Sequence, residues 1–216
     1  GAGPVGLFLA LRLVALGVRP SVIERRQSDR AGSRSIGVHP PCLELLERLG
    51  LVDPFLERGV RIARGRAHLG SRAIGMLDFT SCPGRHRYVV SIPQEETERI
   101  LREALEERAP GCVRGGVALR GVEQSSEAAR VRLEHADGRF VEAETAWLVG
   151  CDGRRSAVRE ASGIGYAGSA YEGRYALLDA ADGTALGDHA GIFLHDAGLV
   201  ESFPLPRRRR RWVVRR

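Results

Sequence analysis

Lysine and asparagine are absent from the 216 residues, so all 33 basic residues are arginine. Such a complete preference for arginine is typical, first of all, of a GC-rich coding sequence. The number of arginines therefore indicates no particular binding partner. Cysteine is scarce, with four residues and no CxxC pair, and the six histidines show no metal-ligand spacing. We therefore expect neither a disulfide framework nor a metal site, and we expect a reducing, cytoplasmic location.

Long apolar runs are also missing. The longest candidate, residues 5–18, is too short to cross a bilayer and is interrupted by Arg12. We therefore expect no membrane span and interpret this run as a buried helix.

The formal net charge of +6 comes from one segment. Residues 207–216 hold seven arginines and no acid, and the rest of the chain has a net charge of −1. A nucleic-acid-binding protein usually spreads its basic residues over a face and adds aromatic residues for stacking. We expect no nucleic-acid partner and interpret the run as a solvated turn, while a polyanion-binding tail remains a rival interpretation.

A glycine-rich turn opens the chain. Gly1, Gly3 and Gly6 match GxGxxG, in which the glycines allow a tight turn, a close approach to a pyrophosphate and close helix packing. An apolar helix follows and can end at Gly17, and a short strand then leads to Glu24, 18 residues after Gly6. An acid near this spacing binds the ribose hydroxyls of a dinucleotide, whose phosphates lie at the helix N-terminus. The order of turn, helix, strand and acid predicts a dinucleotide site. The alternative is a buried helix beside an accidental glycine turn.

Further elements follow in a recognisable order. Helices are predicted from Pro40 to the cap at Gly50 and within the segment 92–111, and Asp137-Gly138 predicts a hairpin turn. The apolar run 146–151 predicts a strand buried on both faces, with Asp152 at its carboxyl end and a helix after it.

With these pieces in place, the chain resembles the FAD-dependent aromatic hydroxylases, the group A flavoprotein monooxygenases of the para-hydroxybenzoate hydroxylase fold. The resemblance rests on "GAGPVGL", "VIERR", "GSRSIGVHPPCLELLERLGL", "IPQEETERIL" and "LVGCDGRRSAVREASGI". It implies an α/β fold: a Rossmann-like FAD-binding domain with a parallel sheet, whose first strand would precede Gly1, and part of a mixed or antiparallel substrate-domain sheet.

The implied domain divisions are residues 1–55 and 93–163 for FAD binding, and 56–92 and 164–216 for the substrate sheet. We further expect the sheet to continue beyond Arg216. A Gly-Asp motif of the family would then also lie beyond Arg216, and we reject Gly187-Asp188 as that motif because strand-like sequence surrounds it.

The resemblance also implies site residues by position. The three opening glycines would line the pyrophosphate, Glu24 would hold the ribose, and Arg25 would lie along the adenine. Near the flavin phosphate or ribityl chain it places Arg34 and Gln94. Asp152 and Gly153 would contact FAD and help NADPH or NADH to dock. For Arg25, Arg34 and Gln94, a plain surface or helix-terminal role stays an alternative.

The implied function is that of an oxidoreductase. NAD(P)H reduces FAD, O2 adds at the flavin C4a position, and the hydroperoxide hydroxylates an aromatic or polyketide-like small molecule. No residue is nominated as a catalytic base, and the chain alone is expected to be inactive. Open alternatives are an epoxidase or reductase of the same fold, and a non-catalytic NAD-binding module.

Overall fold

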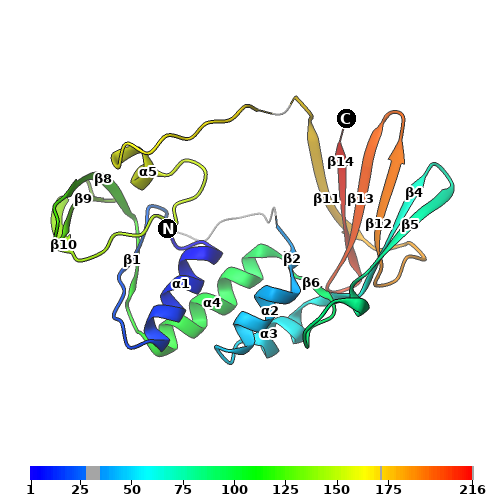
Figure 1. Cartoon of the computed structure of the whole chain (residues 1–216), viewed down its shortest axis with the longest axis horizontal. Coiled ribbons are helices and arrows are strands. Elements are labelled where there is room, and N and C mark those ends of the chain that lie inside the picture. The colour runs from blue at the N-terminus through cyan, green and yellow to red at the C-terminus, as the bar shows by residue number, and fades with distance from the viewer. Residues whose placement is uncertain (28–34, 171, 216) are drawn as a thin grey trace. The chain divides into compact units, whose positions relative to one another are not determined.

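The computed structural model describes residues 1–27, 35–170 and 172–215, and it divides into two compact units (Figure 1). The first unit contains residues 1–32 and 98–169, and the second contains residues 33–97 and 170–216. The expected combination of α/β, parallel and antiparallel structure is confirmed.

The first unit joins helices to two small sheets. Its elements are α1 (Pro4–Ala15), β1 (Val22–Glu24), the part of α4 (Gln94–Arg108) from Glu98 onward, β7 (Val113–Gly115), β8 (Val117–Gln124), β9 (Ala129–His135), β10 (Phe140–Thr145) and α5 (Ala157–Ala161). Strands β1 and β7 pair in parallel, whereas β8, β9 and β10 form an antiparallel sheet whose second turn contains Asp137-Gly138. Gly138 has a φ of 84°, which a tight turn requires and glycine adopts without strain.

Helix α1 buries one face only. Leu7 and Leu11 are fully buried, whereas Val5 is 69% exposed. Packing within the unit therefore buries only some of the apolar side chains of this helix. Gly17 follows the helix with a φ of 78°, as expected for a helix-terminating glycine.

One expected strand is absent. Residues 147–151 form no strand, and Trp147 is 86% exposed. A buried strand needs backbone partners as well as apolar side chains, and the parallel sheet of this unit consists of β1 and β7. The prediction of a doubly buried strand ending at Asp152 is therefore wrong for this structure, although helix α5 does follow.

The second unit is mainly β-structure. Its elements are β2 (Gly37–Val38), α2 (Pro40–Glu47), α3 (Val52–Arg58), β3 (Val60–Ile62), β4 (Arg64–Leu69), β5 (Arg72–Asp78), the 3-10 helix η1 (Phe79–Ser81), β6 (Val89–Ser91), the first residues of α4, β11 (Tyr175–Ala181), β12 (Ala190–His195), β13 (Gly198–Leu205) and β14 (Arg209–Arg215). Prolines at the start of α2 and Gly50 after it, with a φ of 69°, set the expected helix bounds. The small core contains Leu43, Phe55 and Val90.

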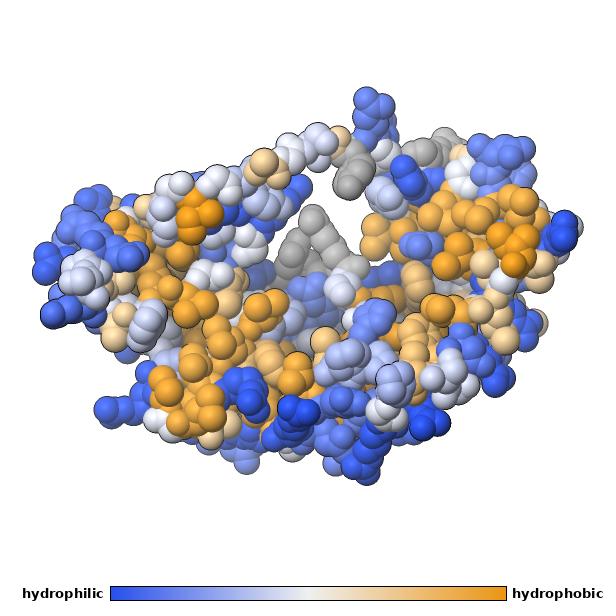
Figure 2. Space-filling model, in the orientation of Figure 1, coloured by the Kyte–Doolittle hydropathy of each residue, from blue (hydrophilic) through white to orange (hydrophobic). Residues whose placement is uncertain are grey.

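A six-stranded sheet dominates this unit, in the order β11-β14-β13-β12-β4-β5. All neighbours are antiparallel except β12 and β4, which confirms a mixed sheet. Apolar side chains gather on the surface over this sheet (Figure 2); exposed examples are Leu69, Ile74, Met76 and Leu77.

The arginine run is not simply a solvated turn. Arg207 and Arg208 lie at the turn between β13 and β14 with positive φ, but Arg210 is fully buried and Arg211 is 3% exposed. Arg211 makes two bonds to Asp179, at 2.6 and 2.7 Å. Arg210 and Arg211 are therefore buried within the unit. Strand β14 has a neighbouring strand on each side, and the carboxylates that pair with its arginines belong to the same unit.

Candidate functional site

The opening glycines form a turn that only glycine can make at two of its positions. A Cβ on Gly6 would lie 1.9 Å from the carbonyl oxygen of Gly1, and a Cβ on Gly1 would lie 2.5 Å from that of Cys151. Gly3 is different, because a Cβ there would have no atom within 4 Å. The loop is thus closed against protein at Gly1 and Gly6 and open at Gly3.

Helix α1 begins directly after this loop with an unblocked N-terminus. Pro4 occupies the first turn, no side chain caps the helix among the described residues, and its first turn has no acidic residue. The first amides of a helix have no partner within the helix, and the helix dipole places positive charge there. The loop and helix together can therefore receive an anion such as a pyrophosphate.

Glu24, at the end of β1, contacts the glycine loop directly. Its Oε2 accepts a bond of 2.9 Å from the Ala2 amide, and its Oε1 accepts bonds from the amide and Nε of Arg26 at 3.1 and 3.0 Å. Burial by itself would raise the pKa of Glu24, but the bonds from Arg26 and Ala2 outweigh it and lower the pKa from 4.5 to about 2. The side chain is thus ionised at neutral pH.

The remaining capacity of this carboxylate matters for ligand binding. A carboxylate has about four acceptor positions, and three donors occupy part of them: two on Oε1 and one on Oε2. Oε2 of Glu24 can therefore accept one more hydrogen bond. A ribose hydroxyl is a donor of the required kind.

Asp152 lies on the other side of the loop. Its Cα is 3.0 Å from the position that a Cβ on Gly1 would take. Its Oδ1 accepts from the Ser156 hydroxyl at 2.5 Å and its Oδ2 accepts from the Val158 amide at 3.2 Å. Burial would raise the pKa of Asp152, but these bonds prevail and lower it. The acid is therefore fixed at the start of α5.

The structure thus brings Glu24 and Asp152 to one loop, although they are far apart in sequence. Glu24 binds the amide of Ala2, and the backbone of Asp152 packs against Gly1, the preceding residue. This arrangement leaves both acids beside the loop that precedes α1. It arises in the first unit alone.

The remaining predicted site residues are Arg25, Gly153, Gln94 and Arg34. Arg25 is exposed, and Gly153 is exposed with a φ of 79°. Gln94 begins α4 in the second unit and accepts a bond of 3.4 Å from the Ser35 amide. Arg34 lies outside the described residues.

Two residues that contribute to this site, Arg26 and Ser156, were not predicted from the sequence. Arg26, rather than its neighbour Arg25, pairs with Glu24. Ser156 both caps α5, by accepting from the Arg159 amide at 3.0 Å, and donates to Asp152. A serine just before a short helical segment was an available capping signal, but nothing in the sequence distinguishes the two adjacent arginines.

The described parts of the chain contain neither a metal-ligand cluster nor a helix that could span a membrane. No group of three or more metal-ligating side chains is found there. Across the same residues, every helix is too short or too polar to pass through a bilayer.

Comparisons with known proteins place this geometry in a family. The family described as FAD binding domain matches residues 1–213. Pentachlorophenol 4-monooxygenase of Sphingobium chlorophenolicum is 34% identical over 173 residues, covering 80% of this chain and 32% of that protein. The chain therefore spans about a third of the length of this curated relative.

Solved structures show the same fold. The p-nitrophenol 4-monooxygenase PnpA from Pseudomonas putida DLL-E4 superposes with a TM-score of 0.90 at 21% identity, over 100% of this chain and 56% of that one. Aklavinone-11 hydroxylase, solved with FAD and aklavinone, gives a TM-score of 0.82 at 25% identity, over 100% of this chain and 44% of that one. The chain belongs to the family described as FAD binding domain, and the proteins similar to it include aromatic monooxygenases.

Proposed function

We propose that this chain is the FAD-binding and substrate-sheet portion of a monooxygenase that hydroxylates an aromatic or polyketide-like small molecule with NAD(P)H and O2. The first unit would bind the ADP part of FAD, and the six-stranded sheet of the second unit would contribute substrate contacts. The observation that carries the proposal is the convergence of Glu24, Asp152 and an uncapped helix N-terminus on one glycine loop.

The residues have distinct tasks in this proposal. The amides at the start of α1 bind the pyrophosphate, and the open side of Gly3 leaves room for it. Oε2 of Glu24 accepts a hydrogen bond from a ribose hydroxyl, while Asp152 and Gly153 contact the cofactor beside the loop. When bound, FAD supplies the transfer of electrons from NAD(P)H to O2 on which hydroxylation depends.

The choice of FAD over NAD rests on two supports beyond the loop. The family match extends to residue 213, well past the glycine loop and into the second unit. The neighbour with aklavinone also contains FAD. A plain NAD-binding module would use the loop and Glu24 but would need no Asp-Gly pair packed against Gly1.

We also propose that this chain alone does not turn over substrate, because its match covers only 32% of the pentachlorophenol 4-monooxygenase. Its four cysteines are unpaired, which fits the reducing environment of the cytoplasm.

Calorimetric titration of the purified chain with FAD and with NAD⁺ tests the cofactor proposal. We expect tighter binding of FAD, and a loss of about tenfold or more in Gly3→Ala, because the added methyl group occupies the proposed pyrophosphate space. Gly75→Ala, also in open space but in β5, is the matched control and should bind FAD normally. Tighter binding of NAD⁺, or unchanged FAD affinity in Gly3→Ala, would contradict the proposal.

A further inference from the structure

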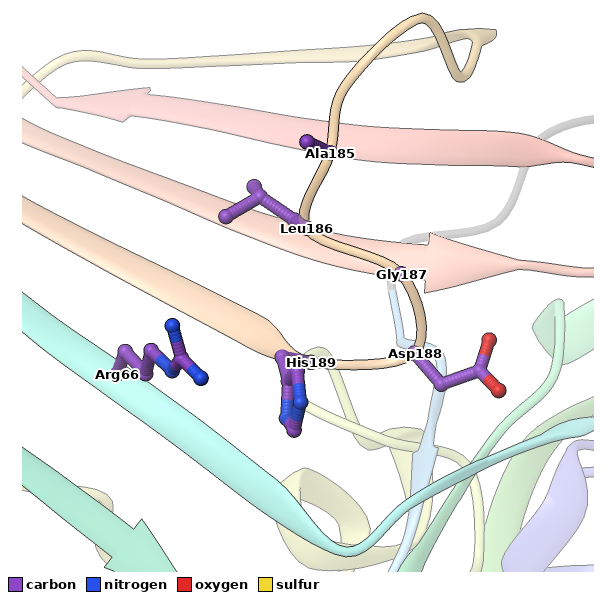
Figure 3. Close-up of a pocket in the computed structure, with 6 residues that line it drawn as sticks. All are labelled: Arg66, Ala185, Leu186, Gly187, Asp188 and His189. Atoms are coloured by element: carbon purple, nitrogen blue, oxygen red, sulfur yellow. The ribbon is translucent and has the colours of Figure 1, made fainter.

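The second unit contains a cavity of about 460 Å³. It lies between strand β4 and the loop that connects β11 to β12 (Figure 3). Its lining residues are Arg66, Ala185, Leu186, Gly187, Asp188 and His189. Cavities of about this size commonly bind small organic molecules.

One side of the cavity is formed by Arg66 of β4, a strand of the six-stranded sheet. Gly191 of β12 pairs with Arg66 of β4 on one side and with Ser202 of β13 on the other. Directly paired residues share a face, so these three form a row across the sheet. Gly191 is buried, and the ring of Phe193 fills the space that a side chain at this position would take.

The ring of Phe193 covers Gly191. A Cβ on Gly191 would lie 2.7 Å from the ring of Phe193 and 3.7 Å from Leu186. Phe193 also stacks on His68, with ring centroids 5.2 Å apart. Leu186 itself lines the cavity and supplies an apolar group in the same lining as Arg66.

The fully buried Arg210 holds the loop that covers the cavity. Arg210 donates to the carbonyl oxygens of Gly187 and His189, to Ser202 and to the carboxylate of Asp182. The bond to His189 is 3.0 Å, and the ion pair with Asp182 is also 3.0 Å. The loop over the cavity is therefore held to the sheet from within, and the cavity is formed before any ligand binds.

Two side chains of the lining have no protein partner among the described residues. No carboxylate there pairs with Arg66 and no hydrogen bond reaches the ring of His189. The guanidinium of Arg66 points toward His189, whereas the carboxylate of Asp188 points away from both (Figure 3). Because Arg66 is exposed, the cavity offers a solvent-accessible guanidinium with an imidazole in the same lining.

We propose that this cavity binds a small organic carboxylate, with the carboxylate on Arg66 and the apolar part against Leu186. A guanidinium forms two parallel hydrogen bonds to a carboxylate, which favours this class over a neutral molecule of the same shape. The proposed site lies within the second unit, and its test uses neither flavin nor turnover.

Benzoate and the neutral benzamide are suitable probes. Two-dimensional amide NMR of the full chain should show benzoate-dependent shifts at Gly187, His189 and Gly191, and benzamide should bind at least about tenfold more weakly. Arg66→Gln should weaken benzoate binding by about tenfold or more. Arg64→Gln is the matched control, because Arg64 lies on the same strand but pairs with Asp78, and it should leave binding unchanged.

Several results would overturn the proposal. These are equal binding of the two probes, shifts confined to other residues, and equal benzoate affinity in Arg66→Gln and the parent chain. Equal losses in Arg64→Gln and Arg66→Gln would show only a general effect of charge. Circular dichroism of each variant checks that it remains folded.

Discussion

Gly3 and Gly6 belong to the same sequence pattern but have different physical roles. Gly6 is required by the protein, since a side chain would collide with the backbone of Gly1. Gly3 faces open space and is required only if a ligand fills that space. A motif match by itself does not separate these roles.

Substitution separates them at the level of folding. We expect Gly6→Ala to lower the free energy of unfolding by about 2–4 kcal/mol, because backbone must move to admit the methyl group. Gly3→Ala should change it by less than about 1 kcal/mol. Urea denaturation measures both values, and equal effects would mean that the close contact of Gly6 with Gly1 is absent in solution.

Glu24 should make stability depend on pH. Its folded pKa of about 2 lies below the ordinary value of 4.5, so its contribution is fully present above pH 4.5 and is lost as the pH falls toward 2. The shift corresponds to about 3 kcal/mol as an upper value. Glu24→Gln should therefore be less stable at pH 7 by up to this amount, and the difference should narrow between pH 4.5 and pH 2.

Denaturant unfolding at several pH values measures this effect. Glu142→Gln, which removes an exposed acid on β10, is the control and should follow the parent chain. A constant difference between Glu24→Gln and the parent chain across the pH range would argue against the ionised carboxylate as the source of stability.

At the scale of elements, strand β14 shows how neighbouring residues with identical side chains differ. Successive residues of a strand point to opposite faces. Arg210 therefore lies on the opposite face from Arg209 and Arg211 and binds the loop before β12. On the other face, Arg211 binds the carboxylate of Asp179, and the exposed Arg209 donates to the Asp179 carbonyl oxygen. Hydrogen bonding to Arg211 is the main cause of the lowered pKa of Asp179.

Removal of the buried arginine should be costly. We expect Arg210→Met to lower the free energy of unfolding by about 3–5 kcal/mol, because Asp182 and two carbonyl groups lose their buried partner. Arg209→Met, one residue away, should cost less than about 1 kcal/mol. Thermal and urea denaturation compare the two variants, and similar losses would show that Arg210 is not held as described.

At the scale of the whole molecule, the terminal arginine run is less exposed than its sequence suggests. Arg210 and Arg211 are buried in the second unit, where Asp182 and Asp179 pair with them. Of the described residues in the run, Arg207, Arg208, Arg209 and Arg215 remain exposed, and these four alone do not form a broad basic face.

Heparin chromatography tests this interpretation. We expect the chain to elute at or below about 0.2 M salt, because few phosphate-like contacts are available. Replacement of Arg207 and Arg208 by serine should shift elution only slightly. Strong retention that this double variant abolishes would restore the polyanion-binding interpretation.

The sequence by itself determined the local features of this protein. The glycine spacing, the prolines before α2, the Asp-Gly hairpin and the acid after β1 each depend on the conformational limits of a few neighbouring residues, and each was predictable. The order of these features also identified the family.

Only the tertiary structure decided which groups meet. It showed that Arg26 rather than Arg25 pairs with Glu24, that Trp147 is exposed, and that Arg210 is buried. These outcomes depend on partners distant in sequence: an apolar run becomes a buried strand only where neighbouring strands complete its hydrogen bonds, and an arginine can be buried only where carboxylates and carbonyls surround it.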